Sequence, residues 1–147
     1  MELNEDANGF SLSFKDGRIQ LVQIDFRLSL LFSDGADQIW LHIETPGKIK
    51  SVTSETVFVP AQSRTLASIL PFVNAAVRGI RIERTGYLTI EFQKESLLSV
   101  GPDKAYEAWQ LQISSEKGQM LLVCPPGGEI AIFRDTKVPP APENRLN

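Results

Sequence analysis

Residues 22–35 read Val-Gln-Ile-Asp-Phe-Arg-Leu-Ser-Leu-Leu-Phe-Ser-Asp-Gly, and this stretch decides the fold. Every second position from Val22 to Phe32 is apolar, which would place these side chains on one face of an extended chain. The Ser-Asp-Gly at residues 33–35 is typical of a turn, and residues 39–43 then alternate in the same way. The pattern predicts a long strand with one buried face and a return strand beside it, and therefore an antiparallel sheet.

A further hairpin is predicted just upstream of this stretch. Residues 10–14 alternate between apolar and polar side chains, and residues 15–17 read Lys-Asp-Gly, in which glycine can adopt the positive φ of a tight turn. A second strand would then start at Ile19. The apolar parity changes between Leu21 and Val22, which predicts a bulge or a bend, because a slip of one residue exchanges the two faces of a strand.

The rest of the chain continues the β pattern, with one helical segment in the middle. Ser63 is predicted to cap a short helix whose inward stripe is Leu66, Ile69, Leu70 and Val73. The helix is expected to end or kink near Pro71. Further strands are expected at residues 80–82, 88–92, 98–100, 109–113, 120–123 and 130–133.

These elements predict a single α+β domain over residues 1–134. It would consist mainly of antiparallel β hairpins, arranged as a sheet or a partly open barrel, with one short helix packed on it. Residues 135–147 contain three prolines and little apolar bulk, and we expect a flexible tail there.

The composition excludes several classes of function. The 147 residues are 42% apolar and carry a net charge of −3, so no basic footprint for nucleic acid or for an anionic membrane is present. One cysteine and one histidine exclude an intramolecular disulfide and a multi-histidine or multi-cysteine metal site. No metal or cofactor is therefore expected. The acidic N-terminus lacks the features of a signal peptide, and a cytoplasmic protein is expected.

The single histidine and the single cysteine are both interpreted as structural. His42 lies on a predicted strand beside Trp40, with no nucleophile marked near it, and a half-exposed strand histidine is the favoured interpretation over a catalytic base. Cys124 follows an apolar run and precedes two prolines. A reactive thiol needs nearby positive charge, which the adjacent sequence lacks, so a buried cysteine is favoured.

One cluster of carboxylates could carry chemistry. Asp103 and Glu107 would lie on one side of a helical turn with Tyr106 beside them, although Asp103 could equally cap that turn. Trp40, Tyr106 and Trp109 are candidates for interface anchors, because aromatic residues often anchor interfaces. For Trp109, which starts an alternating apolar run, burial is the favoured interpretation.

Three segments together resemble a known family. They are Asp25-Phe26-x-Leu28 leading to Phe32-x-Asp34-Gly35, Gly101-Pro102-Asp103-x-x-Tyr106-Glu107-Ala108-Trp109-x-Leu111, and Cys124-Pro-Pro-Gly-Gly-Glu-Ile-Ala. The family is one of small uncharacterised bacterial proteins, catalogued as a domain of unknown function, and the resemblance spans residues 19–133. The Pro-Asp-x-x-Tyr-Glu-Ala-Trp segment is its most specific part. Residues 93–95, Gln-Lys-Glu, depart from the family, which tends to have a second Asp-Gly turn there. The resemblance implies a fold-sized unit and passes on no catalytic residues.

The function expected from these observations is a non-enzymatic protein-interaction module. The family's size and β-rich pattern are similar to those of immunity proteins, so neutralisation of a bacterial toxin is a candidate role by analogy of class. The partner would be a protein, and exposed edge strands favour a homodimer. The candidate binding residues are Trp40, His42, Asp103, Tyr106, Glu107 and Trp109. The alternative is a small carboxylate-dependent enzyme with its site near Asp103, Tyr106 and Glu107, which would require a concave pocket where these side chains converge.

Overall fold

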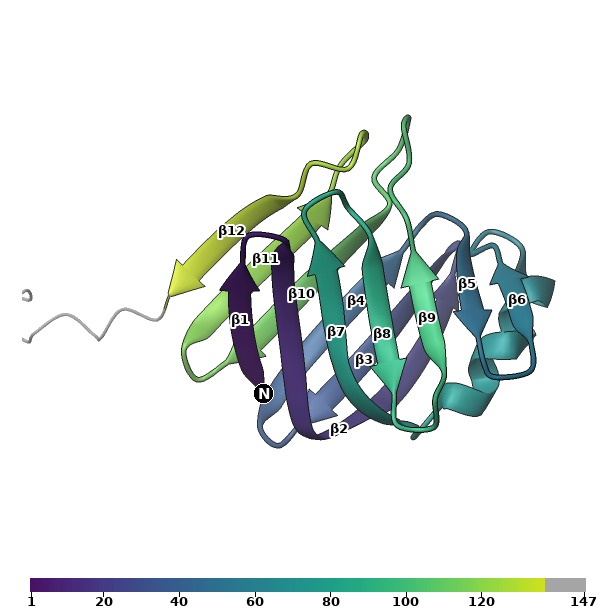
Figure 1. Cartoon of the computed structure of the whole chain (residues 1–147), viewed down its shortest axis with the longest axis horizontal. Helices are drawn as coiled ribbons and strands as arrows, with labels where there is room; N and C mark the ends of the chain where they lie inside the picture. The colour runs from purple at the N-terminus through teal and green to yellow at the C-terminus, as the bar shows by residue number, and fades with distance from the viewer. Residues whose placement is uncertain (137–147) are drawn as a thin grey trace, which may run out of the picture.

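The structure, a computed structural model, describes residues 1–136 and consists mostly of antiparallel β-sheet folded into two layers (Figure 1). The front layer contains β1 (Glu2–Asp6), the first half of β2 (Gly9–Asp25), β7 (Ala76–Glu83), β8 (Leu88–Phe92), β9 (Leu97–Val100), β5 (Gly47–Lys50) and β6 (Glu55–Phe58). The back layer contains the second half of β2, β3 (Arg27–Asp34), β4 (Asp37–Ile43), β10 (Trp109–Ser115), β11 (Gly118–Cys124) and β12 (Ala131–Thr136). The path of pairing ends at β12 and β6, so the sheet is not closed into a barrel.

Strand β2 joins the two layers, and the hairpin predicted at Lys15-Asp16-Gly17 is wrong. The chain runs on through these residues as one strand. The pairing of β2 with β7 shifts register between Ser13 and Gly17, where the chain bends from one layer to the other. The bend is held by the Asp34 carboxylate, which accepts hydrogen bonds from the backbone N–H of Lys15 at 3.1 Å and of Asp16 at 2.9 Å. Backbone donors that a strand partner would satisfy are therefore satisfied by a side chain.

The single strand predicted over residues 22–32 is also wrong, because the chain reverses at Phe26. Asp25 pairs with Arg27, Phe26 has a φ of +54°, and its side chain is 87% exposed instead of buried. The register is symmetric about Phe26, with Ile24 opposite Leu28. Even-numbered residues therefore lie on the same face before and after the reversal. For this reason, the alternation of this hairpin cannot be told in the sequence from the alternation of one long strand.

The predicted parity change occurs as a bulge one residue earlier than expected. The register between β2 and β3 shifts between Ile19 and Leu21, so Gln20 is the extra residue. Ile19 is fully buried, whereas Leu21 is 44% exposed and points outward. The bulge thus turns an apolar side chain to the outside of the back layer.

The core lies between the two layers and contains most of the predicted apolar positions. Its fully buried side chains include Ile19, Leu28, Leu30, Phe32, Ile39, Leu41, Ile43, Phe58, Leu88, Ile90, Trp109, Leu111 and Leu122. The turns predicted at residues 33–35 and at Lys117-Gly118 are confirmed, and Gly35 and Gly118 both have positive φ. Strands β1, β5 and β6 were not predicted.

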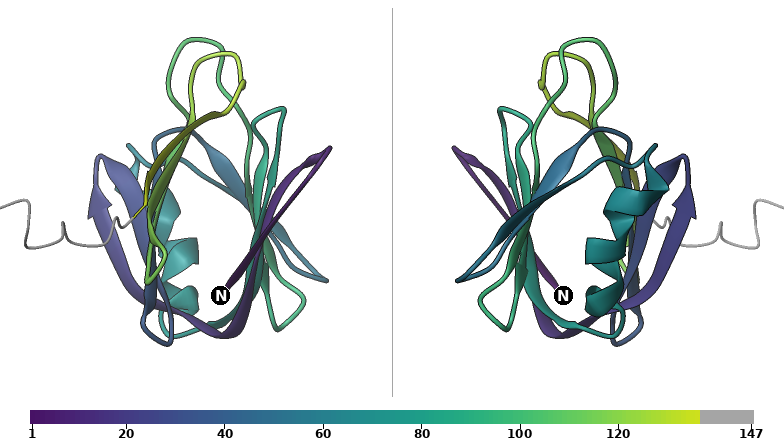
Figure 2. Two further views of the ribbon diagram at one scale, coloured as in Figure 1. Left: turned by 90° about the vertical axis from the view of Figure 1, so that its left-hand side faces the viewer. Right: turned by 90° about the vertical axis from the view of Figure 1, so that its right-hand side faces the viewer.

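One helix, the 3₁₀ helix η1 (Ser63–Phe72), occurs in residues 1–136, and it lies at one side between the layers (Figure 2). Leu66 and Ile69 are buried as predicted, whereas Leu70 and Val73 are exposed. Positions three apart eclipse in a 3₁₀ helix, so the buried stripe follows every third residue. The predicted cap is wrong, since Gln62 occupies the cap position and no side chain of residues 1–136 bonds the helix start.

The structure describes no helix in residues 1–136 that is long and apolar enough to cross a membrane. Strand β12 continues to Thr136, beyond the predicted domain boundary at residue 134. The rest of the predicted tail lies outside the described residues.

Candidate functional site

The outward side of the back layer, which we call the back face, is formed by alternate residues of the second half of β2 and of β3, β4, β10, β11 and β12. Strand registers arrange these residues in rows that cross all six strands. The first central row is Gln23, Ser29, His42, Gln110, Val123 and Ala131. The second central row is Leu21, Leu31, Trp40, Gln112, Leu121 and Phe133.

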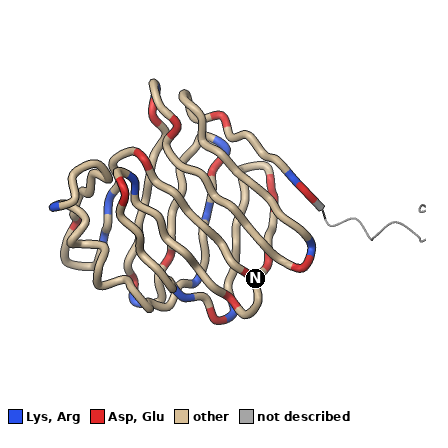
Figure 3. The backbone as a smooth tube through the Cα atoms, turned by 180° about the vertical axis from the view of Figure 1, so that it is seen from behind, with Lys and Arg blue, Asp and Glu red and all other residues tan. Residues whose placement is uncertain are grey.

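None of the twelve side chains in these two rows carries a formal charge at neutral pH when His42 is neutral. Charged residues flank them. Asp25, Arg27 and Glu44 lie at one end of the strands, and Arg18 and Asp135 lie at the other. Figure 3 views the molecule from this side and colours the charged residues. The back face therefore has an uncharged centre and a charged margin.

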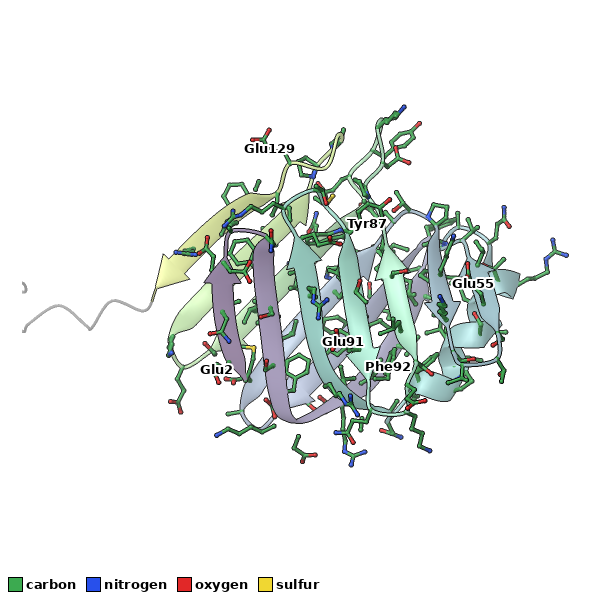
Figure 4. All side chains as sticks on the ribbon, viewed as in Figure 1. Glu2, Glu55, Tyr87, Glu91, Phe92 and Glu129 are labelled. Atoms are coloured by element: carbon green, nitrogen blue, oxygen red, sulfur yellow. The ribbon has the colours of Figure 1, made fainter. Side chains whose placement is uncertain are left out.

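The outward side of the front layer, the front face, has the opposite character. Its two central rows are Asn4, Ser11, Arg81, Thr89, Ser99, Lys48 and Val57, and Glu2, Ser13, Gly79, Glu91, Leu97, Lys50 and Glu55. Six of these fourteen residues are charged, and two ion pairs cross neighbouring strands, Arg81–Glu91 at 3.0 Å and Lys48–Glu55 at 3.4 Å. Glu2, Glu55 and Glu91 of this face are labelled in Figure 4. This is the composition of a solvated sheet face. The difference in charge between the two faces makes the back face the candidate functional site.

Trp40 and His42 lie at the centre of the back face, on β4. Their rings are stacked with centroids 5.7 Å apart and an angle of 9° between planes. Nδ1 of His42 is hydrogen-bonded to the hydroxyl of Ser29 at 2.7 Å, which fixes the orientation of the ring. The interpretation of His42 as a half-exposed strand histidine beside Trp40 is confirmed.

The ring of His42 is held in its neutral form. Burial lowers its pKa, and the positive charge of Arg27 lowers it further. The other charged groups near it are Glu44 on the same strand and Glu107, which accepts a hydrogen bond from Gln110, the neighbour of His42 in the row. The centre of the back face therefore stays uncharged at neutral pH.

Trp109 is fully buried, as its alternating sequence favoured, and so has no surface on which a partner could bind. Its indole Nε1–H donates a hydrogen bond to the carbonyl of Gly86 at 2.9 Å. Gly86 has a φ of +104°, and a Cβ there would lie 2.9 Å from Sγ of Cys124. Trp109, Gly86 and Cys124 form one closely packed structural cluster.

Cys124 is buried, and the interpretation of it as a structural residue is confirmed. Burial and the negative charge of Glu107 raise the pKa of its thiol to about 11. The thiol is thus protonated at neutral pH and is a poor nucleophile.

The carboxylate cluster does not converge on a pocket. Oδ1 of Asp103 accepts hydrogen bonds from the backbone N–H of Ala105 and Tyr106 at 2.7 and 3.0 Å, so it caps its own turn. Tyr106 is 71% exposed, and Glu107 is bonded to Gln110. Asp103, Tyr106 and Glu107 line none of four surface clefts of the described chain. These clefts lie near residues 6–11 and 81–85, near residues 112–121 and 133–135, near residues 1–3 and 113–120, and near residues 71–76 and 92–96.

The structure adds neighbours to the back face that the sequence did not single out. Leu31, Leu121 and Phe133 share the row of Trp40, and Phe133 is 59% exposed. The alternation in the sequence already places each of these side chains on the outward side of its own strand. That they lie next to one another depends on the pairing of strands that are distant in the sequence. In residues 1–136, no group of three or more His, Cys, Asp or Glu side chains is placed to hold a metal ion.

Comparison with known proteins identifies the family. A family model described as a family of unknown function (DUF6188) matches residues 10–134, and the chain belongs to that family. The resemblance in the sequence is therefore confirmed. No curated protein and no solved structure matches the chain.

Proposed function

Because membership of a family of unknown function assigns no reaction, we propose that this chain is a non-enzymatic protein-interaction module that binds its partner through the back face. One observation carries the proposal. The two central rows of the back face hold no charge among twelve residues, whereas those of the front face hold six charges among fourteen.

The composition of the back face supports this role. Protein interfaces are depleted of charged residues at their centre and enriched in aromatic residues, while their margins are polar. Trp40 supplies a rigid aromatic ring at the centre, and Phe133 and Leu21 supply exposed apolar surface at the two ends of the same row. Gln110 and Gln112 add amide groups that can bond a partner.

The face is also available and ordered. Helix η1 contacts β6 and β2 and lies between the layers, so it does not cover the back face (Figure 2). The six strands hold each side chain in register, and the Ser29 hydroxyl fixes His42. A preorganised surface loses little conformational freedom on binding, which favours affinity.

Substitution of Gln112 tests the proposal. Gln112→Glu introduces a negative charge into the middle of the back face with almost no change in shape, and the side chain is exposed, so the fold should tolerate it. Gln93→Glu makes the same exchange in the exposed turn between β8 and β9 and is the matched control.

The expected result is selective loss of binding. Protein captured from native cells by the wild-type chain and by Gln93→Glu should bind Gln112→Glu at least about tenfold more weakly, equivalent to about 1.4 kcal/mol. Capture that is equal for all three chains would mean that the partner binds elsewhere, and the proposal would be wrong. A captured toxin whose activity the chain inhibits would support the narrower immunity-type role.

A further inference from the structure

We propose that the occupant of the back face is a second copy of this chain, stacked face to face about a two-fold axis that lies in the interface at right angles to the strands. The inference rests on the proposed binding role of the back face.

The area of the back face is sufficient for a stable dimer. With strands about 4.8 Å apart and residues about 3.3 Å apart, six strands and about seven residues along each cover roughly 650 Å². Two copies would bury about 1,300 Å² in total, which falls within the range of about 1,200–2,000 Å² for stable interfaces.

One oppositely charged pair in the margin of the face, Arg18 and Asp25, would meet under this symmetry. The axis keeps each strand over its own copy and reverses its direction, so the two ends of β2 meet. Arg18 lies opposite Ser33 at one end of the face, and Asp25 lies opposite Arg27 at the other. Each Arg18 would therefore face Asp25 of the second copy, and this opposite-charge contact would form twice.

The two central rows are also complementary in size. The same axis places the row of His42 over the row of Trp40. A small side chain would then face a large one at β12, with Ala131 over Phe133 of the other copy, whereas Ser29 and Leu31 are buried within each chain. Alternation of small and large residues across facing positions lets two sheets interdigitate.

The centre of the assembly places His42 over Trp40 and Gln110 over Gln112 of the second copy. Facing amides can donate and accept hydrogen bonds reciprocally, so neither glutamine needs a charged partner. A glutamate at position 112 would instead lie near Glu107, which already bonds Gln110. One residue exchange therefore opposes this dimer specifically.

Sedimentation velocity of the purified full chain over the micromolar range tests the proposal. The wild-type chain and Gln93→Glu should be dimers, and Gln112→Glu should dissociate at least about tenfold more readily. Asp25→Arg should weaken the dimer, because it would face Arg18. Arg18→Asp combined with Asp25→Arg should restore the dimer to within about threefold, because the exchanged charges attract again.

A wild-type chain that stays monomeric, or a dimer that Gln112→Glu leaves intact, would overturn the inference. A dimer sensitive to Gln112→Glu but not restored by the double exchange would overturn the two-fold arrangement. Failure here is separable from failure of the proposed function. A monomer whose cellular partner is lost with Gln112→Glu retains a binding back face with a different occupant.

Discussion

The buried indole of Trp109 should be essential for stability, and Trp109→Phe measures its contribution. Its side chain is fully buried, and its Nε1–H donates a hydrogen bond to the Gly86 carbonyl at 2.9 Å. Within residues 1–136, the only other hydrogen bond of that carbonyl is the weak one from Sγ of Cys124 at 3.7 Å. Phenylalanine would leave a buried acceptor without a strong partner.

The expected loss follows from two contributions. A buried acceptor left without its partner costs about 1–3 kcal/mol. The smaller ring also leaves a void, and at about 24 cal/mol per Å³ a void of roughly 40 Å³ costs about 1 kcal/mol. Trp109→Phe should therefore reduce the free energy of unfolding by about 3 kcal/mol, a large part of the ~5–15 kcal/mol of a typical domain.

Urea unfolding followed by far-ultraviolet circular dichroism measures this loss. Trp40→Phe is the control, because Trp40 lies on the back face, partly exposed, and its exchange should cost no more than about 1 kcal/mol. A loss below about 1 kcal/mol for Trp109→Phe, or equal losses for both variants, would refute the reasoning.

Gly79→Ala should lower the free energy of unfolding by at least about 2 kcal/mol in urea unfolding, because its Cβ would lie 2.2 Å from the Leu12 carbonyl oxygen; wild-type stability would contradict this. Cys124 is buried, and the pKa of its thiol is about 11. It should therefore react with iodoacetamide at pH 8 at least about 100-fold more slowly in the folded chain than in urea. Equal reaction rates would contradict its burial. Because the pKa of His42 is lowered from its usual value of about 6.5, the ring should become charged only as the pH falls below that value, and binding at the back face should weaken over that range. His42→Gln should abolish this pH dependence in sedimentation or capture, and an unchanged pH profile would assign it to another group.

The lowered pKa of His42 also fixes the direction of its effect on folding. The folded chain favours the neutral ring, so it binds fewer protons than the unfolded chain. His42 therefore costs no stability well above its usual pKa of about 6.5, and the cost grows as the pH falls from there toward the lowered value. Binding that buries the ring further would lose affinity over the same range.

Most of the strands could be predicted from alternation, but their connections could not. The reversal at Phe26 is invisible to a period-two pattern because the hairpin is symmetric about that residue. The bend at Lys15-Asp16-Gly17 has the local sequence of a turn, and the carboxylate that satisfies its backbone donors belongs to Asp34, eighteen and nineteen residues away. Local residue types do not reveal a distant hydrogen-bond partner.

The candidate site was predictable only in part, for a related reason. Trp40 and His42 are conspicuous because they occupy the outward positions of a strand whose inward positions are Ile39, Leu41 and Ile43. Their neighbours Leu31 and Leu121 come from other strands, and the row can be drawn only once the registers of five strand pairs are known. A row across a sheet is a property of pairing, whereas alternation is a property of one strand.

The charge of the outward-facing residues of each strand can nevertheless be read from a single sequence. On β10 and β11 the outward residues are Gln110, Gln112 and Ser114, and Gln119, Leu121 and Val123, all uncharged. On β7 and β8 the outward residues include Arg81, Glu83 and Glu91. A solvated strand gains nothing by excluding charge from its outward positions, whereas an interface does, because unpaired charges are costly to bury. Charge sorted by parity between strands, more than apolar content, is therefore the signal that favours the back face as the proposed binding surface.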